Sequence, residues 1–202
     1  ALRPATPPPK AEAAALDAAG TFLQPNTRLA DGTLAFVHVT PADMPWRVAI
    51  RPPPTPPRYG SRAAARDAAV EAMRMWEAAI QPHVPWFRLE FVEDDPSAAV
   101  QIQWKRRITG PYAGFGGQRP RMQGGALRVG GEMGISTTPD NFMHLTVDEV
   151  RLLVAHEFGH VLGLGHCLEC DSAMNYERVL VTQTDVRTFV ELLKQPNPSA
   201  IE

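Results

Sequence analysis

Three histidines lie close together in the stretch HEFGHVLGLGH, which runs from His156 to His166. On a helix, His156 and His160 project from one face one turn apart, so both imidazoles can reach the same metal ion. Gly163 follows three residues after His160, and glycine commonly ends a helix because it accepts a left-handed backbone conformation. A sharp turn there lets His166 swing back as a third ligand. The spacing therefore predicts a metal site made of three imidazoles.

The chemistry of such a site is catalytic rather than structural. Three protein ligands leave one position open for water, whereas structural zinc sites fill all four positions, usually with thiolates. Glu157 stands beside the first histidine, where its carboxylate can hold and deprotonate a zinc-bound water instead of ligating the metal. The metal lowers the pKa of this water and polarises a carbonyl, and the base takes the proton. This pattern predicts hydrolysis of peptide bonds; the alternative is a pair of surface or core histidines on a helix.

Together with Met174, the motif resembles the zinc site and methionine turn of the metzincin metallopeptidases. The gap of seven residues between His166 and Met174 is similar to that of the matrixins, the matrix metalloproteinases and their bacterial relatives. The resemblance implies a zinc endopeptidase of the α+β class. Its twisted, mainly parallel sheet would have an antiparallel edge strand, and an active-site helix and a C-terminal helix would accompany the sheet.

The same resemblance assigns roles to three residues after the motif. Met174 would form the hydrophobic floor under the imidazoles, although by composition alone it is a buried methionine. Asp185 would hold the methionine turn, and its alternative is an acid favoured by the dipole of the last helix. Tyr176 matches a tyrosine of astacins and serralysins that ligates the zinc or bonds the reacting oxygen. Matrixins usually place a tyrosine directly after the methionine, so Asn175 is a departure, and a packing role for Tyr176 stays open.

The remaining elements must position these residues. Three helices are predicted from caps and apolar stripes: from Ser61 to about Ile80, from Val147 behind the capping box of Thr146 and Glu149, and from Thr182 to Leu193. Alternating apolar residues predict five strands: 34–39, 46–50, 87–92, 100–104 and 127–135. The resemblance places the edge strand, which would bind the substrate peptide, in the glycine-rich segment 109–125; a mobile loop is the alternative.

Length and composition indicate one domain with tails. The 202 residues suffice for one well-buried core. Residues 1–33 are predicted to be a Pro/Ala-rich arm or linker, residues 34–195 the catalytic domain, and residues 196–202 a C-terminal tail. A formal net charge of −2 gives no reason to propose nucleic acid or an anionic membrane as partner. No apolar run approaches transmembrane length, and we expect a monomer acting on a protein or peptide.

The only two cysteines, Cys167 and Cys170, lie between the third histidine and the methionine turn. In an exported protein so close a pair favours a small disulfide, while a second metal site would need further soft ligands. The chain begins at Ala1, as after removal of a leader, although an artificial chain boundary would look the same. We therefore expect a secreted, extracellular or cell-envelope protein.

The sequence gives no sign of a second zinc site. The histidines outside the motif, at 38, 83 and 144, are too scattered for a second zinc, so one catalytic Zn²⁺ is expected, with calcium possible.

An inhibitory N-terminal arm would need an acidic side chain to occupy the open metal position, because neither cysteine precedes the motif. Asp31 is the candidate for this role. The alternative is that Asp31 only shapes an Asp-Gly turn. The competing functions are an exported zinc-binding protein without proteolytic activity and a zinc hydrolase with a distant acidic third ligand.

Overall fold

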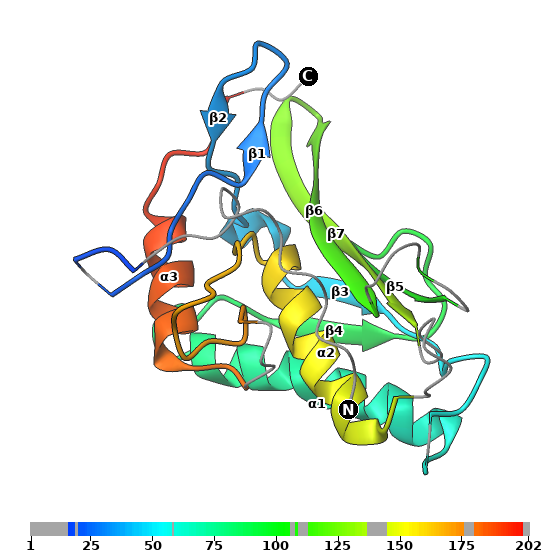
Figure 1. Ribbon diagram of the computed structural model, residues 1–202. Helices are drawn as coiled ribbons and strands as arrows, with labels where there is room; N and C mark the ends of the chain where they lie inside the picture. Colours follow the sequence, from blue (N-terminus) through cyan, green and yellow to red (C-terminus); the bar gives the residue numbers. More distant parts are fainter. Residues whose placement is uncertain are drawn as a thin grey trace.

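The computed structural model describes residues 16–18, 20–57, 59–105, 108, 113–136, 145–175 and 180–199. Within them the chain forms seven strands, three α-helices and one 3-10 helix (Figure 1). In chain order these are β1 (Thr27–Arg28), β2 (Leu34–Ala35), η2 (Pro41–Asp43), β3 (Trp46–Ala49), α1 (Arg62–Ile80), β4 (Leu89–Val92), β5 (Val100–Lys105), β6 (Gly114–Gln123), β7 (Ala126–Ser136), α2 (Val147–Val161) and α3 (Gln183–Leu193).

Five strands form one mixed sheet in the order β4-β3-β5-β7-β6. Strands β4, β3, β5 and β7 pair in parallel, and β6 pairs antiparallel with β7 at one edge. The register of that last pair runs from Gly114 opposite Ile135 to Gln123 opposite Ala126. The glycine-rich segment is therefore an edge strand, as expected, and the predicted α+β class with an antiparallel edge is confirmed.

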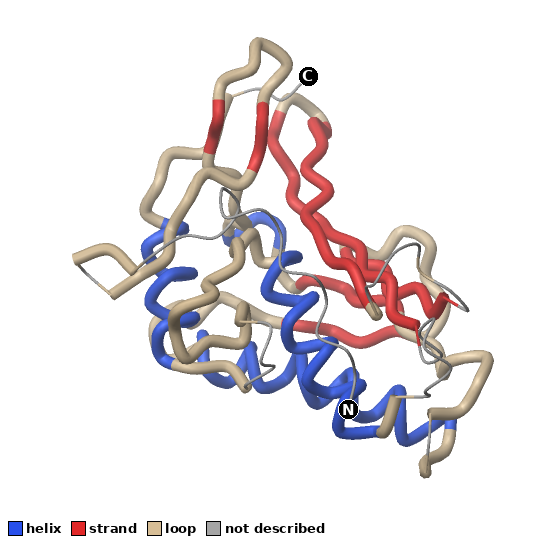
Figure 2. Tube along the Cα trace, in the orientation of Figure 1, coloured by secondary structure: helices blue, strands red, loops and turns tan. Residues whose placement is uncertain are grey.

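Helices α1 and α2 lie on the same side of this sheet (Figure 2). The Trp76 indole N–H on α1 donates to the Ala155 carbonyl of α2 over 2.8 Å, so the two helices are joined by a buried hydrogen bond as well as by packing. Trp46 of β3 makes edge contacts with Phe87 and Phe158, at centroid distances of 6.2 and 6.4 Å. This aromatic core fixes α2 against the sheet.

The predicted helix starts agree with the structure. Ser61 caps α1 by accepting the Ala64 N–H over 3.0 Å. Thr146 and Glu149 form the expected capping box of α2: the Glu149 carboxylate accepts the Thr146 N–H over 2.7 Å, and the Thr146 hydroxyl accepts the Glu149 N–H over 3.2 Å. Thr182 precedes α3, again with a capping box. Each helix therefore begins where the sequence indicates.

The N-terminal part of the fold departs from expectation. Residues 34–39 were predicted as one strand, but only Leu34–Ala35 forms a strand, paired with Thr27–Arg28 outside the main sheet. Val37 is buried together with the next two residues, His38 and Val39, and its backbone N–H and carbonyl are both bound by the Asn26 side chain. A side chain thus takes the place of a neighbouring strand. Phe22, within the predicted arm, is buried in the core.

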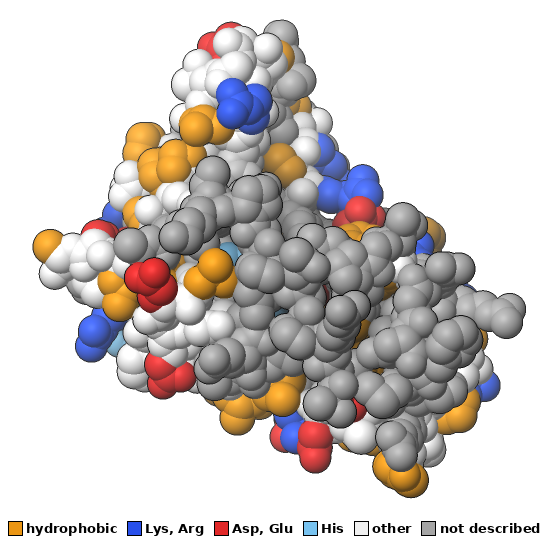
Figure 3. All heavy atoms as spheres, viewed as in Figure 1, with side chains coloured by type: hydrophobic (Ala, Val, Ile, Leu, Met, Phe, Trp, Pro, Cys, Tyr) orange, Lys and Arg blue, Asp and Glu red, His pale blue; other side chains and the backbone are white. Residues whose placement is uncertain are grey.

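None of the helices in the described ranges is long and apolar enough to cross a membrane. On the face drawn in Figure 3, charged side chains of both signs occur in small separate groups. Ion pairs among the described residues include Arg119 of β6 with Glu132 of β7, and Arg151 with Asp148 on α2. These exposed pairs contribute little to stability.

Candidate metal centre

Three imidazoles converge at the C-terminal end of α2. His156 and His160 come from the helix, and His166 comes from the loop that follows it. One ligand atom of each lies within 4.8 Å of the others, so the three can hold a single metal ion. The Nε2 atoms of His160 and His166 are 3.1 Å apart. The structure thus brings together all three histidines that the spacing selects.

Backbone carbonyls orient two of these rings. The Nδ1 atom of His156 is 2.8 Å from the Ala173 carbonyl, and the Nδ1 atom of His160 is 2.8 Å from the Leu164 carbonyl. A carbonyl can only accept, so each Nδ1 carries the proton and each Nε2 presents its lone pair to the centre. This is the tautomer of a metal-binding histidine whose other nitrogen is held by an outer partner.

Burial keeps two of the imidazoles, those of His160 and His166, neutral. Burial lowers the pKa of His160 below its usual 6.5, against a smaller opposing effect of the hydrogen bond to Leu164. Burial, followed by repulsion from His160, lowers the pKa of His166 to about 4. At neutral pH both rings are therefore unprotonated, as metal ligation requires.

The turn from helix to third ligand depends on Gly163, whose φ of +96° lies in the left-handed region. Its N–H donates to the His160 carbonyl over 3.0 Å, which ends the helix. A Cβ at this position would also lie 2.5 Å from the Asn26 Nδ2 atom and 2.6 Å from the Gln118 Nε2 atom. Glycine is thus required both for conformation and for space.

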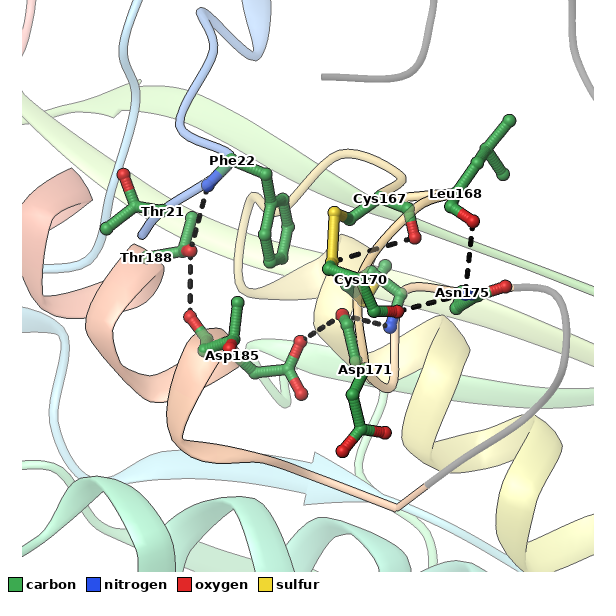
Figure 4. Close-up of a disulfide and its surroundings, with 12 residues drawn as sticks. Thr21, Phe22, Cys167, Leu168, Cys170, Asp171, Asn175, Asp185 and Thr188 are labelled. Atoms are coloured by element: carbon green, nitrogen blue, oxygen red, sulfur yellow. Dashed lines mark hydrogen bonds between the residues drawn. A yellow bond between two sulfur atoms is a disulfide. The ribbon is translucent and has the colours of Figure 1, made fainter. Parts of the chain in front are cut away.

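Met174, the residue expected to form the floor of the site, is fully buried. A Cβ on Gly159 of α2 would overlap the Met174 sulfur, so the helix and the methionine turn are in direct contact. Asp185 of α3 accepts hydrogen bonds from the Ala173 N–H over 2.9 Å and from the Ser172 hydroxyl (Figure 4). The structure therefore places Asp185 against the methionine turn, where its carboxylate fixes the backbone.

Asp185 also closes the start of its own helix, because its carboxylate accepts the Thr182 N–H over 2.8 Å and the Thr182 hydroxyl over 3.0 Å. Burial raises the pKa of Asp185, while the bonds from Ser172, Ala173 and Thr182 act in the opposite direction. One buried carboxyl group thus joins the start of α3 to the methionine turn.

The loop between His166 and Met174 is closed by a disulfide between Cys167 and Cys170, as predicted. The Asn175 side chain donates to the carbonyls of Leu168 and Cys170, at 3.2 and 2.9 Å. Asn175, the departure from the usual matrixin residue, therefore holds the disulfide loop. Tyr176, the candidate catalytic tyrosine, lies outside the described residues.

Glu157 is 6 % exposed and lies against the edge strand β6. A Cβ on Gly114 would be 2.7 Å from the Glu157 Oε1 atom, and one on Gly116 would overlap the Glu157 backbone carbonyl. The glycines of β6 let the helix that carries the predicted base approach the strand. The run GFGG was the only sequence signal for this contact, and it does not reveal the partner.

The N-terminal residues at the site were missed by the sequence reasoning. Asp31, the candidate plug, is exposed in the turn between β1 and β2, where its carboxylate accepts the Thr33 N–H over 2.8 Å. Hydrogen bonds from Thr33 lower the pKa of Asp31. This geometry fits the turn-forming alternative. Two N-terminal residues, Gln24 and Asn26, lie against Gly165 and Gly163 in the loop that leads to His166. Neither belongs to a recognisable sequence motif.

The mixed sheet has an antiparallel edge, a helix carries two of the histidines, and a glycine turn leads to the third. These features define a metzincin-type domain. The sequence model of the matrixin family matches residues 43–190, most of the chain, so the chain belongs to the matrixins. No curated protein sequence matches it significantly.

Proposed function

We propose that this chain is a zinc-dependent endopeptidase that cleaves peptide bonds within proteins or peptides. The observation that carries the proposal is the convergence of three imidazole nitrogens within 4.8 Å, with a nearly buried glutamate beside the first of them. Three nitrogen ligands suit Zn²⁺ and leave a position for water or substrate. Bound zinc would supply Lewis acidity toward a water and toward the scissile carbonyl.

The side chains of the site have distinct tasks in this proposal. His156, His160 and His166 would hold the ion through Nε2, with their orientation fixed by backbone carbonyls. Glu157 would accept a proton from the attacking water and deliver it to the leaving amine. Its burial against β6 supports this role, because a carboxylate shielded from solvent interacts strongly with charge that develops nearby.

The edge strand suggests how a substrate binds. Among the described strands, β6 pairs with β7 alone, so its other side can accept an extended peptide as a further antiparallel strand. Main-chain hydrogen bonds of this kind would align the peptide with the metal site, since Gly114 and Gly116 lie directly against Glu157. We also propose that the protein works outside the cytoplasm, which the Cys167–Cys170 disulfide supports.

Elemental analysis and a peptidase assay test this function together. We expect one zinc per chain, loss of zinc in His160→Ala, and cleavage of casein that a chelator abolishes. Glu157→Ala should keep its zinc and fold but lose activity by about 10²-fold or more, as expected for removal of a general base. Glu90→Ala, an exposed acid on β4, is the control.

Two results would overturn the proposal. The first is a wild-type protein that does not bind zinc. The second is near-normal turnover in Glu157→Ala, which would assign the proton transfer elsewhere. A protein that binds one zinc but cleaves none of the members of a broad peptide library would favour the alternative, a zinc-binding protein without proteolytic activity.

A further inference from the structure

Residues 20–26, here called the strap, lie against the loop of residues 162–166, here called the zinc loop, which joins α2 to the third histidine. The Phe22 N–H donates to the Thr188 hydroxyl of α3 over 3.3 Å, and its ring is fully buried. In the close-up the Phe22 ring points toward the disulfide between Cys167 and Cys170 (Figure 4). One end of the strap is thus anchored in the core beside the loop that follows the third histidine.

At the other end of the strap, the Asn26 side chain joins two separate parts of the chain. Its Oδ1 atom accepts the Val37 N–H over 2.8 Å, and its Nδ2 group donates to the Val37 carbonyl over 2.8 Å. The same Nδ2 group donates to the Gly163 carbonyl over 3.1 Å. Val37 is fully buried, so Asn26 ties the zinc loop to a fixed point of the core.

The tethered loop is the one that sets the geometry of two ligands. Gly163 begins the turn that delivers His166, and the next carbonyl, that of Leu164, accepts the Nδ1 proton of His160 over 2.8 Å. The strap also fits closely against the following residue, because a Cβ on Gly165 would overlap the Gln24 carboxamide. A displacement of this loop would therefore move one imidazole and release another.

We propose that Asn26 is a positioning residue of the metal centre, which it preorganises by holding the Gly163 carbonyl. This inference rests on the proposed function, because it assumes that the three histidines bind zinc. It adds a residue outside the metal motif, 137 positions before its partner in the loop. Partners beyond the direct ligands typically change metal affinity by about 10- to 100-fold when they are removed.

The chain offers a matched control for Asn26. Asn197 also bridges backbone groups with its side chain: its Oδ1 atom accepts the His38 N–H over 2.9 Å, and its Nδ2 group donates to the His38 carbonyl over 3.0 Å. His38 is the neighbour of Val37, so the two asparagines bind adjacent residues of one segment. Only Asn26 reaches the zinc loop.

The test compares full-length Asn26→Ala with Asn197→Ala. Zinc dissociation constants are measured by competition with a chromophoric chelator, and the visible spectrum of the Co²⁺-loaded proteins reports ligand geometry. We expect Asn26→Ala to weaken zinc binding by about 10-fold or more and to alter the Co²⁺ spectrum. Asn197→Ala should match the wild type in both measurements, even if both variants lose similar thermal stability.

Asn26→Asp keeps the test decisive if Asn26→Ala does not fold. This variant retains an acceptor for the Val37 N–H but replaces the group that donates to the Gly163 carbonyl with an oxygen. It should therefore also weaken zinc binding. In the zinc-free protein it should speed amide exchange at residues 163–166. Unchanged zinc affinity in the Asn26 variants would overturn this inference alone. A wild-type chain that does not bind zinc would instead overturn the proposed function.

Discussion

The close approach of β6 to α2 gives a direct way to displace the predicted base without touching the metal ligands. In Gly114→Ala, the added methyl group would sit 2.7 Å from the Glu157 Oε1 atom and 2.9 Å from its Cγ atom. The nearest atoms belong to a side chain, so the strand and the helix backbone can stay in place while the carboxylate moves. The substitution therefore acts on the position of Glu157.

The size of that movement follows from the contact distances. Ordinary van der Waals contact of a Cβ atom begins at 3.4 Å, and the Oε1 atom falls about 0.7 Å short of it. Misplacing a catalytic group by about 1 Å can cost about 10²-fold in rate. We therefore expect kcat for peptide cleavage to fall by about 10- to 100-fold in Gly114→Ala, with zinc content unchanged.

A double-mutant cycle with Glu157→Ala shows whether the loss runs through the base. If it does, Gly114→Ala should have almost no further effect once Glu157 is gone. Gly117→Ala is the control for stability and zinc binding, because a Cβ there meets nothing within 4 Å. Equal losses from Gly114→Ala in both backgrounds, or full activity in the single variant, would refute this reasoning.

Three further perturbations can be measured by denaturant unfolding. Asp185→Ala leaves the Ser172 hydroxyl and the Ala173 N–H buried without their acceptor, so we expect a loss of about 3 kcal/mol or more; a loss below about 1 kcal/mol would contradict the assigned role. Gln118→Met replaces a carboxamide whose two polar atoms are buried without a hydrogen-bond partner among the described residues, and should raise the free energy of unfolding by about 1 kcal/mol; a decrease would mean that the carboxamide is satisfied. The pKa of His166 is lowered to about 4 in the folded chain, so between pH 6.5 and 4 the unfolded chain binds more protons. The zinc-free protein should therefore lose stability as the pH falls through this window, and a flat profile would contradict the shift.

Local chemistry explains why much of the fold could be predicted. Caps and periodicity depend on residues a few positions apart, so the starts of α1, α2 and α3 were found from Ser61, Thr146 and Thr182. The convergence of the three histidines was equally predictable, because two of them lie on one helix and the third follows after a glycine turn. The disulfide joins cysteines three positions apart. The resemblance to matrixins supplied the antiparallel edge, which no local pattern determines.

The features that sequence reasoning missed depend on distant partners. Residues 34–39 alternate in sequence, but Val37, His38 and Val39 are all buried in the structure. A strand also needs a paired backbone, and here the Asn26 side chain bonds the Val37 backbone instead. Phe22 is a single large apolar residue without periodicity, so its burial in the core left no signal. The glycines of β6 indicated a close approach without naming Glu157 as the neighbour.

The main-chain acceptors of His156 and His160 affect how the metal centre tolerates change. An outer partner that is a side chain can be deleted by one substitution, whereas the carbonyls of Ala173 and Leu164 are present whatever residue occupies those positions. Substitutions at Ala173 and Leu164 should therefore matter less than substitutions at the residues that fix the backbone around them. These residues are Gly163, the buried Asp185 and the distant Asn26. An engineer who transplants this centre to another scaffold must copy the course of the main chain, because copying the ligand side chains alone leaves the two rings without their hydrogen-bond acceptors.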